Sequence, residues 1–440
     1  MVSLILAFLS FSTGSTAKAA DVLSREAAVR EALGGSPTLA KAQASTEEQS
    51  WKKTEIFGYF LPTIQATGAR YFVKQLEYQD LDFGGQPAHV PLLIPATRAT
   101  LNVNWQIFDG FANFYRFAGA RRLNSAAEND FDWAKFQLEQ ETRLRFNEAL
   151  AAAKLQDVAE QNVSTLTDHL EQVTKTRRGG FATNFDVLRV EVQLNEAQSE
   201  LLRTKDDVVL ARQKLAQVMG IDPTAETREI SGDLEIPAAK GLSDLKLGDG
   251  TDRKDLQAVA LRSEAADFQS MAASTYWVPR VALGAQYTLY NNRTDGMTDW
   301  SQYRPAWNAG VFVTWSLFDL GQIAKSKEAG FQKIQAEKTL AQARLTLPTD
   351  FELWKRRYIY SAALYEARLS DVKKGEESVR LAKASMKAGV RTNSEVLDAE
   401  LDLFRARAGL VNSLKNCAEA RLRLELSIGH KLPQLAKNST

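Results

Sequence analysis

Two segments of the chain place apolar and small residues at alternating steps of three and four positions. One runs from Val187 to Val218 and the other from Val396 to Ser427. A spacing near 3.5 residues gathers these side chains on one face of an α-helix and is typical of coiled coils, in which small residues allow close approach. We therefore predict a packed helix in each segment, although the pattern does not identify the helix against which each one packs.

Ahead of each of these two segments lies a longer stretch with the composition of a helix. Residues 111–178 and 321–387 are rich in Ala, Leu, Glu, Gln, Lys and Arg, and they contain a single proline, Pro348. At a rise of about 1.5 Å per residue, a helix of about 68 residues would be roughly 100 Å long. Proline costs about 3 kcal/mol in a helix interior. Pro348 is therefore expected to kink or interrupt the second long helix.

Apolar and polar residues alternate in four short stretches between these helical segments, at 59–74, 97–108, 276–290 and 306–318. In the second stretch, Leu101, Val103, Trp105 and Ile107 alternate with Thr100, Asn102, Asn104 and Gln106. Such alternation predicts strands with one apolar and one polar face, and about 10 to 15 residues are enough for a tilted strand to span a membrane. Loops at 76–96 and 291–305 connect the two strands of each pair.

The distribution of tryptophan favours a membrane environment for these strands. Five of the eight tryptophans fall in or beside them: Trp105, Trp277, Trp300, Trp307 and Trp315. An aromatic girdle requires such a placement. The alternative is a soluble hairpin with one buried face, which alternates equally well. Because four strands cannot close a barrel by themselves, the membrane interpretation requires several copies of the chain.

The chain also repeats itself. Residues from about 36 to 220 reappear in the same order from about 253 to 429. Gly180-x-x-Thr183-Asn184-x-x-Val187-Leu188 matches Gly389-x-x-Thr392-Asn393-x-x-Val396-Leu397 at an offset of 209. A near-constant offset predicts two copies of one structural unit. We divide the chain into a first repeat (21–220), a linker (221–252), a second repeat (253–430) and a flexible tail (431–440).

Composition narrows the function classes. With 55 basic and 54 acidic residues, there is no electrostatic case for binding nucleic acid. One cysteine and three histidines exclude a disulfide framework and argue against a His/Cys metal site. Cys417 lies in the apolar seam, which favours a buried position. We find no catalytic triad, carboxylate dyad or cofactor motif, so we predict no enzyme activity and no cofactor.

The first 20 residues resemble a secretory signal peptide. An apolar run is followed by small residues and the pair Ala17-x-Ala19, which predicts cleavage near Ala19 or Ala20. A buried apolar element is the alternative. After this segment no apolar stretch reaches 18 residues, so a transmembrane helix is not expected.

Three local motifs give the chain a resemblance to the TolC-like outer-membrane efflux protein family. The motifs are Phe60-Leu61-Pro62 with Trp277-Val278-Pro279, Phe108-Asp109-Gly110 with Phe318-Asp319-x-Gly321, and the string from Ala388 to Ala399. The resemblance implies an α+β membrane protein that forms a trimer. Four strands per protomer would make a 12-stranded transmembrane β-barrel, and the helices would continue it as a coiled-coil tunnel across the periplasm.

Gly180 and Gly389 stand where one helix ends and the next begins, as a glycine after a helix C-terminus does. They predict a tight turn between helices. Glu395 and Asp398 lie three residues apart on one helix face, and the resemblance implies that they form an acidic ring at a closed periplasmic entrance. It also implies that Asp186 and Arg391 form a latch between neighbouring helices. The alternative for these four residues is helix capping or a solvated surface. Met386 replaces an aromatic latch partner present in some relatives.

The resemblance therefore implies the exit duct of a tripartite efflux or type I secretion system, located in the outer membrane of a Gram-negative cell. Its partners would be two further copies of the chain, a periplasmic adaptor (membrane fusion) protein, an inner-membrane pump or ABC transporter, and outer-membrane lipid. A structural or adhesive periplasmic coiled-coil protein is the alternative. The sequence does not identify the cargo among drugs, metals and proteins.

Overall fold

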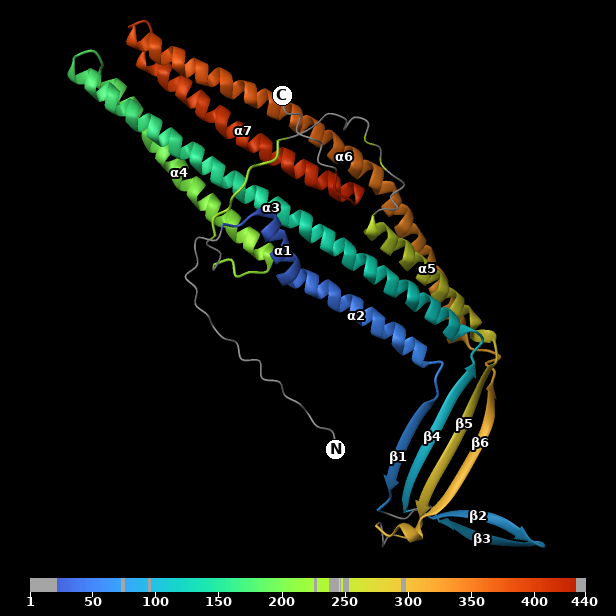
Figure 1. Cartoon of the computed structure of the whole chain (residues 1–440). Helices are drawn as coiled ribbons and strands as arrows, with labels where there is room; N and C mark the ends of the chain where they lie inside the picture. The colour runs from blue at the N-terminus through green and yellow to red at the C-terminus, as the bar shows by residue number, and fades with distance from the viewer. Residues whose placement is uncertain are drawn as a thin grey trace. The chain divides into compact units, whose positions relative to one another are not determined.

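The computed structural model describes residues 22–72, 76–93, 96–224, 228–236, 245, 247, 253–293 and 298–432. The predicted signal peptide, the tail after residue 432 and most of the predicted linker after residue 236 lie outside the described residues. Figure 1 labels the helices and strands.

The elements follow one another in a similar order in the two halves of the sequence. The first half contains α1 (Arg25–Gly35), α2 (Pro37–Gly58), β1 (Thr63–Arg70), β2 (Leu76–Phe83), β3 (Gln86–Leu93), β4 (Thr97–Phe108), α3 (Ala112–Arg178) and α4 (Asn184–Met219). The second contains α5 (Lys254–Ser274), the 3-10 turn η1 (Thr275–Trp277), β5 (Arg280–Asn291), η2 (Trp300–Gln302), β6 (Arg304–Thr314), α6 (Leu320–Lys387) and α7 (Asn393–Ile428).

Two local predictions differ from the structure. The segment 76–96, predicted as a loop, contains the antiparallel hairpin β2–β3, which turns at Gly84 and Gly85 with φ of 68° and 92°. Prolines at 87 and 91 disfavour a strand in general, but in a two-stranded sheet each strand has a free edge where proline is tolerated. Pro348 does not interrupt α6, which runs unbroken through it. Its neighbours Leu347 and Phe351 are buried, and their packing offsets the lost backbone hydrogen bond.

The chain forms two compact units. We call one the strand unit; it comprises Ala42–Trp133 and Arg253–Thr346. The other, the tip unit, comprises Met1–Lys41, Ala134–Asp252 and Leu347–Thr440. The long helices α3 and α6 contribute residues to both.

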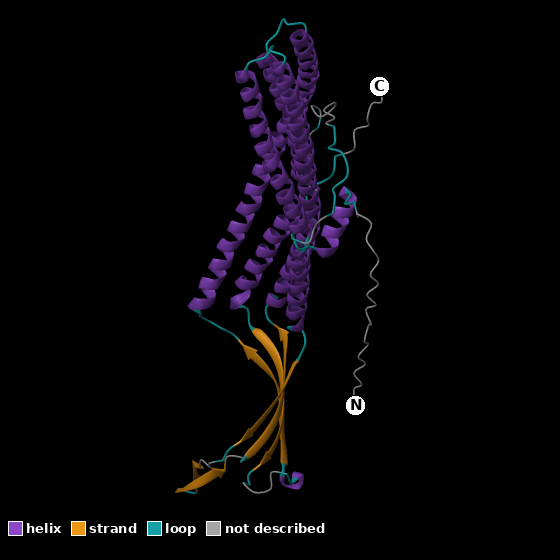
Figure 2. Cartoon of the chain, turned by 90° about the vertical axis from the view of Figure 1, so that its left-hand side faces the viewer, coloured by secondary structure: helices purple, strands orange, loops and turns teal. Residues whose placement is uncertain are grey.

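In the strand unit, four strands form one antiparallel sheet in the order β1-β4-β5-β6. Figure 2 shows how strongly this sheet twists. The central pair, β4 and β5, comes from different halves of the sequence, so the two repeats share a single sheet. In each repeat, an equivalent tryptophan at the end of the sheet donates a hydrogen bond to a backbone carbonyl that precedes the first strand of that repeat. The Trp105 indole N–H donates to the Phe60 carbonyl at 2.8 Å, and that of Trp315 to the Trp277 carbonyl at 2.9 Å.

In the tip unit, α4 packs on the end of α3 and α7 packs on the end of α6. The buried contact between α3 and α4 includes Leu166, Val173 and Val190, and Leu397 of α7 joins it. A second contact joins Ala382 of α6 to Val396 and Ala399 of α7. The seam residues from the sequence are buried or half-buried, and the buried ones include Val187, Val190, Ala197, Val208 and Leu215 in α4. The coiled-coil prediction is therefore confirmed.

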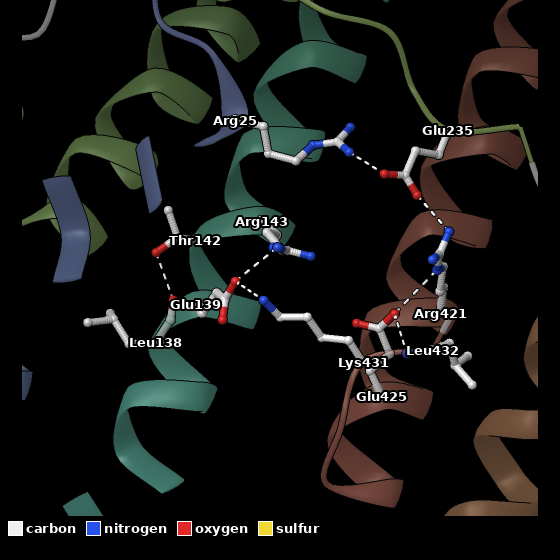
Figure 3. Close-up of polar contacts among 10 residues, drawn as sticks. All are labelled: Arg25, Leu138, Glu139, Thr142, Arg143, Glu235, Arg421, Glu425, Lys431 and Leu432. Atoms are coloured by element: carbon white, nitrogen blue, oxygen red, sulfur yellow. Dashed lines mark hydrogen bonds and ion pairs between the residues drawn. The ribbon is translucent and has the colours of Figure 1, made fainter. Parts of the chain in front are cut away.

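A polar cluster ties the segments that follow α4 and α7 to the helices of the tip unit (Figure 3). Glu235 pairs with Arg25 and accepts a hydrogen bond from Arg421 at 2.7 Å, while Glu139 accepts from Arg143 at 2.9 Å and pairs with Lys431. Glu425, only 2% exposed, accepts from Arg421 at 3.3 Å. Burial raises the pKa of Glu425 above its usual value, although Arg421 opposes this.

Candidate functional site

Both tip turns have the backbone geometry that only glycine adopts without strain. Gly180 and Gly389 have φ of 81° and 75°. The Gly180 N–H donates to the Arg177 carbonyl at 2.9 Å, and the Gly389 N–H donates to the Met386 carbonyl at 3.0 Å. A left-handed residue lets the chain reverse directly after each long helix and leaves few carbonyls unpaired. The turns between the last two helices of each repeat therefore have the same backbone geometry.

Asp186 and Glu395 occupy equivalent positions, and both cap the helix that follows the turn. Asp186 accepts a hydrogen bond from the Thr183 N–H at 2.9 Å, while the Asp186 N–H donates to the Thr183 hydroxyl at 3.2 Å. Glu395 accepts from the Thr392 N–H at 3.2 Å. Hydrogen bonds from the side chain and backbone of Thr183 lower the pKa of Asp186. Each carboxylate also lies at the positive end of the helix dipole.

The two predicted latch residues do not meet within one chain. Arg391 is exposed, and among the described residues its side chain has no hydrogen bond or ion pair. Asp186 is already engaged with Thr183. The structure of the single chain thus accounts for a capping role of Asp186 and leaves Arg391 available to another partner.

Asp398, the second predicted acidic-ring residue, contacts the other repeat. Its carboxylate lies 3.5 Å from the guanidinium of Arg189, and Arg189 also donates to the Ser394 hydroxyl. This contact joins α4 to α7 near the tip turns. Arg189 was not among the site residues predicted from the sequence, although it is the residue of the first repeat that corresponds to Asp398. The opposite charges of these two residues, at equivalent positions of the two repeats, were the sequence feature that could have indicated this contact.

Below the turns, a buried polar group connects three helices. His169 of α3 and Glu400 of α7 are 3% and 4% exposed. The His169 Nδ1 atom lies 2.7 Å from a Glu400 carboxylate oxygen, its Nε2 lies 2.6 Å from Oδ1 of Asn393, and Lys383 of α6 pairs with Glu400 at 2.7 Å. Burial by itself would raise the pKa of Glu400, but the hydrogen bonds and charges of His169 and Lys383 outweigh it and lower that pKa.

His169 was not predicted as a site residue from the sequence, and its burial assigns it a structural role. No local pattern marks this group, because His169 and Glu400 are 231 residues apart. Glu400 follows Ala399 of the predicted seam. The helical period could therefore have indicated the burial of Glu400, but no other feature of this group.

The four-stranded sheet has two chemically different faces. On one face, which we call the apolar face, Ile64, Leu101, Trp105, Trp307 and Val311 are exposed. The opposite face, which we call the polar face, includes a row of carboxamides that crosses all four strands. This row consists of Gln65, Asn102, Gln286 and Asn308, which are register partners from β1 to β6. A sheet of this kind fits between a nonpolar and an aqueous medium.

Two other kinds of site were sought. Within the described residues, no three His, Cys, Asp or Glu side chains lie close enough together to hold a metal ion. No described helix combines the length and hydrophobicity needed to span a membrane.

Comparison with known proteins agrees with this arrangement of helices and strands. The family model described as outer membrane efflux protein matches residues 94–221 and 251–430. No curated protein sequence matches the chain. Among solved structures, the outer membrane protein VceC from Vibrio cholerae is 18% identical with a TM-score of 0.75, and the match covers 92% of this chain and 96% of that one.

Two further channels have similar folds. The CmeC outer membrane channel of Campylobacter jejuni is 12% identical, with a TM-score of 0.76 and coverage of 94% of this chain and 87% of that one. The open state of the MtrE outer membrane channel of Neisseria gonorrhoeae is 17% identical, with a TM-score of 0.73 and coverage of 92% and 89%. At these identities the likeness shows the fold.

The family match covers more than half of the chain, so the chain belongs to the outer membrane efflux protein family. As a member of this family, it is an outer-membrane efflux protein. The resemblance drawn from the sequence motifs is thus confirmed. Members of this family are transporters, which also confirms the prediction that the chain is not an enzyme.

Proposed function

We propose that three copies of the chain close a 12-stranded transmembrane β-barrel and that their helices form a tunnel across the periplasm. The observation that carries this proposal is the open sheet. Within the described residues, β1 and β6 each have one edge without a partner strand. Open edges and an exposed apolar face are costly in water. Pairing β6 of one copy with β1 of the next would satisfy both edges.

The directions and lengths of the strands fit this closure. All neighbours in the sheet are antiparallel, so β1 and β6 run in opposite directions and can pair antiparallel between copies. The result is an even number of strands, as in bacterial outer-membrane barrels. β4 and β5 contain 12 residues each. At about 3.3 Å per residue and a tilt of about 45°, that length crosses a hydrocarbon layer.

We further propose that this trimer is the exit duct of a tripartite efflux or type I secretion system. It would receive substrate from an inner-membrane pump or ABC transporter through a periplasmic adaptor protein, and the pump would supply the energy. The tip turns support the contact with an adaptor. Phe181 and Val390, one on each turn, are 88% and 79% exposed, and exposed apolar residues at the end of a structure mark a docking surface.

The acidic residues of the second repeat would control the entrance. In a trimer, Glu395 and Asp398 each become a ring of three like charges, which favours cations. Asp186 and Arg391 do not meet within a chain, so their latch would form between neighbouring chains. An arginine–carboxylate bond of this kind holds helices together until it is broken.

Cysteine cross-linking between the edge strands tests the barrel. With Cys417 replaced by alanine, Gln65→Cys in β1 is combined in turn with Ala306→Cys, Asn308→Cys and Gly310→Cys in β6, because all four positions lie on the polar face. One or two of these pairs should yield disulfide-linked dimers and trimers in outer-membrane fractions, while each single variant yields none. The purified protein should conduct ions in planar bilayers. A non-conducting monomer without cross-links would overturn the proposal and favour a structural or adhesive role.

A further inference from the structure

The polar face of the sheet carries arginine but no carboxylate. Three of its residues in the four strands are charged, namely Arg98, Arg280 and Arg304, and the others are neutral. The carboxamide row lies between Arg98 and Arg304 at one end of the sheet and Arg280 at the other. Any charge preference on this face is therefore determined at its two ends.

The two ends differ in how the arginines are compensated. Arg280 lines a cavity together with Arg116 and the carboxylate-bearing Asp109. Arg98 and Arg304 are at the other end, where the strands lead into 76–93 and 291–303. Both are exposed, and neither has a hydrogen bond or ion pair with a described residue. Asp299, the carboxylate nearest to Arg304 in the sequence, accepts from Ser301 and Gln302.

Arg98 and Arg304 also lie at one level of the sheet. Each is the register partner of Tyr290, Arg98 on one side and Arg304 on the other. Strands are about 4.8 Å apart, so the two arginine backbones are separated by roughly 10 Å. Two guanidinium groups at that spacing, neither of them paired with a described residue, create a positive potential over the polar face at this end.

We propose that Arg98 and Arg304 form a binding ring for oxyanions, such as carboxylate, phosphate or sulfate groups on a passing solute, at this end of the barrel lumen. The inference rests on the proposed trimer, in which the polar face lines the lumen and six arginines lie at one level. Guanidinium groups bind carboxylate and phosphate in a bidentate manner, and a ring of like charges within a pore selects the opposite ion.

The ring has the opposite sign to the acidic residues Glu395 and Asp398 in the tip unit. A cation-favouring entrance followed by an anion-binding ring would act as two independent charge filters. The overall ion selectivity of the wild-type channel therefore does not reveal the arginine ring. The contribution of the ring has to be measured as the change in selectivity caused by substitution of the two arginines.

The test uses purified full-length protein in planar bilayers of phosphatidylcholine. Reversal potentials are measured in a KCl gradient, and current block is measured with inositol hexakisphosphate added to either side. In Arg98→Gln/Arg304→Gln, the permeability of chloride relative to potassium should fall several-fold, and block from one side should require at least ten times more inositol hexakisphosphate. Arg98→Lys/Arg304→Lys, which keeps the charge, should retain most of both properties.

Arg70→Gln is the matched control, because Arg70 lies at the same end of the sheet on the apolar face. It should leave both measurements unchanged. Unaltered selectivity and block in a conducting Arg98→Gln/Arg304→Gln trimer would overturn the ring, as would an equal effect of Arg70→Gln. Failure of the wild-type protein to conduct would instead count against the proposed channel. The two failures are therefore distinguishable.

Discussion

Arg189 and Asp398 occupy the same position in the two repeats, 209 residues apart, and form an ion pair of 3.5 Å with each other. Duplication usually places equivalent residues in equivalent surroundings. Here the two copies of one helix, α4 and α7, contact each other, so one position faces its own counterpart. Opposite charges at that position turn a contact between similar helices into an attraction. The ion pair therefore bridges the two helix hairpins beside their tip turns.

We expect Arg189→Ala to raise single-channel conductance with little loss of stability. The pair is exposed, with side-chain exposures of 40% and 67%, and such pairs contribute about 0–1 kcal/mol. The bridge should therefore affect the distance between the hairpins more than the folding free energy. Arg203→Ala is the control, since Arg203 pairs with Glu200 and Asp207 inside α4. Equal conductance in wild type and Arg189→Ala would mean that the pair does not restrain the hairpins.

Glu395→Ala combined with Asp398→Ala should weaken cation selectivity and reduce block by multivalent cations. The physical reason is the loss of two rings of negative charge at the proposed entrance. Reversal potentials and block by hexamminecobalt check it. Because Glu395 also caps α7, Glu395→Gln with Asp398→Asn is needed beside it, as these side chains are neutral and similar in shape. Selectivity that survives in both double variants would leave only the capping role of Glu395 and the ion pair of Asp398 with Arg189.

Arg391→Ser should increase conductance while the unfolding temperature of the detergent-solubilised protein stays close to that of wild type. The side chain has no hydrogen bond or ion pair among the described residues of its own chain, so the substitution removes only a contact with a neighbouring chain. Asp186→Ala is a poorer test, because it also removes a helix cap worth about 1 kcal/mol. Conductance that does not change would identify Arg391 as an ordinary surface residue.

The features predicted correctly from the sequence are those that depend on residues close to one another in the chain. The seam from Val187 to Val218 follows from a helical period, and the turns at Gly180 and Gly389 follow from a residue type that tolerates positive φ. The strands 97–108 and 306–318 follow from alternation, and their observed limits differ by only a few residues from those expected. In each case the neighbours in sequence are also the neighbours in space.

The features that sequence reasoning missed depend on residues that are distant in the chain. His169, Glu400 and Asn393 meet only because α3 and α7 pack side by side, and no spacing in the sequence records that contact. The hairpin β2–β3 was missed for a different reason, since its prolines and glycines are typical of loops and its short paired edges tolerate them. Pro348 lies within a helix because buried neighbours hold the backbone on both sides.

The buried group around Glu400 predicts a pH-dependent stability. A carboxylate whose pKa is lowered on folding, as for Glu400, stabilises the protein above its ordinary pKa, and this stabilisation is lost as the pH falls through the lowered value. Glu400→Gln should therefore destabilise the protein by roughly 2 kcal/mol near neutral pH, the range expected for hydrogen bonds to a charged group. The destabilisation should shrink as the pH falls below about 4.5, the ordinary pKa of a glutamate side chain.

Thermal unfolding of wild type and Glu400→Gln between pH 3 and pH 7 measures this difference directly. Comparing the two proteins is necessary because Glu425, whose pKa is raised by burial, contributes with the opposite sign: its protonated form is favoured in the folded state, so its contribution falls as the pH rises. Glu425 is present in both proteins and cancels in the comparison. A Glu352→Gln variant, on the exposed side of α6 and paired only with Arg356 among the described residues, provides the matched control. A difference between wild type and Glu400→Gln that stays constant across the whole range would show that folding does not shift the pKa of the Glu400 carboxyl.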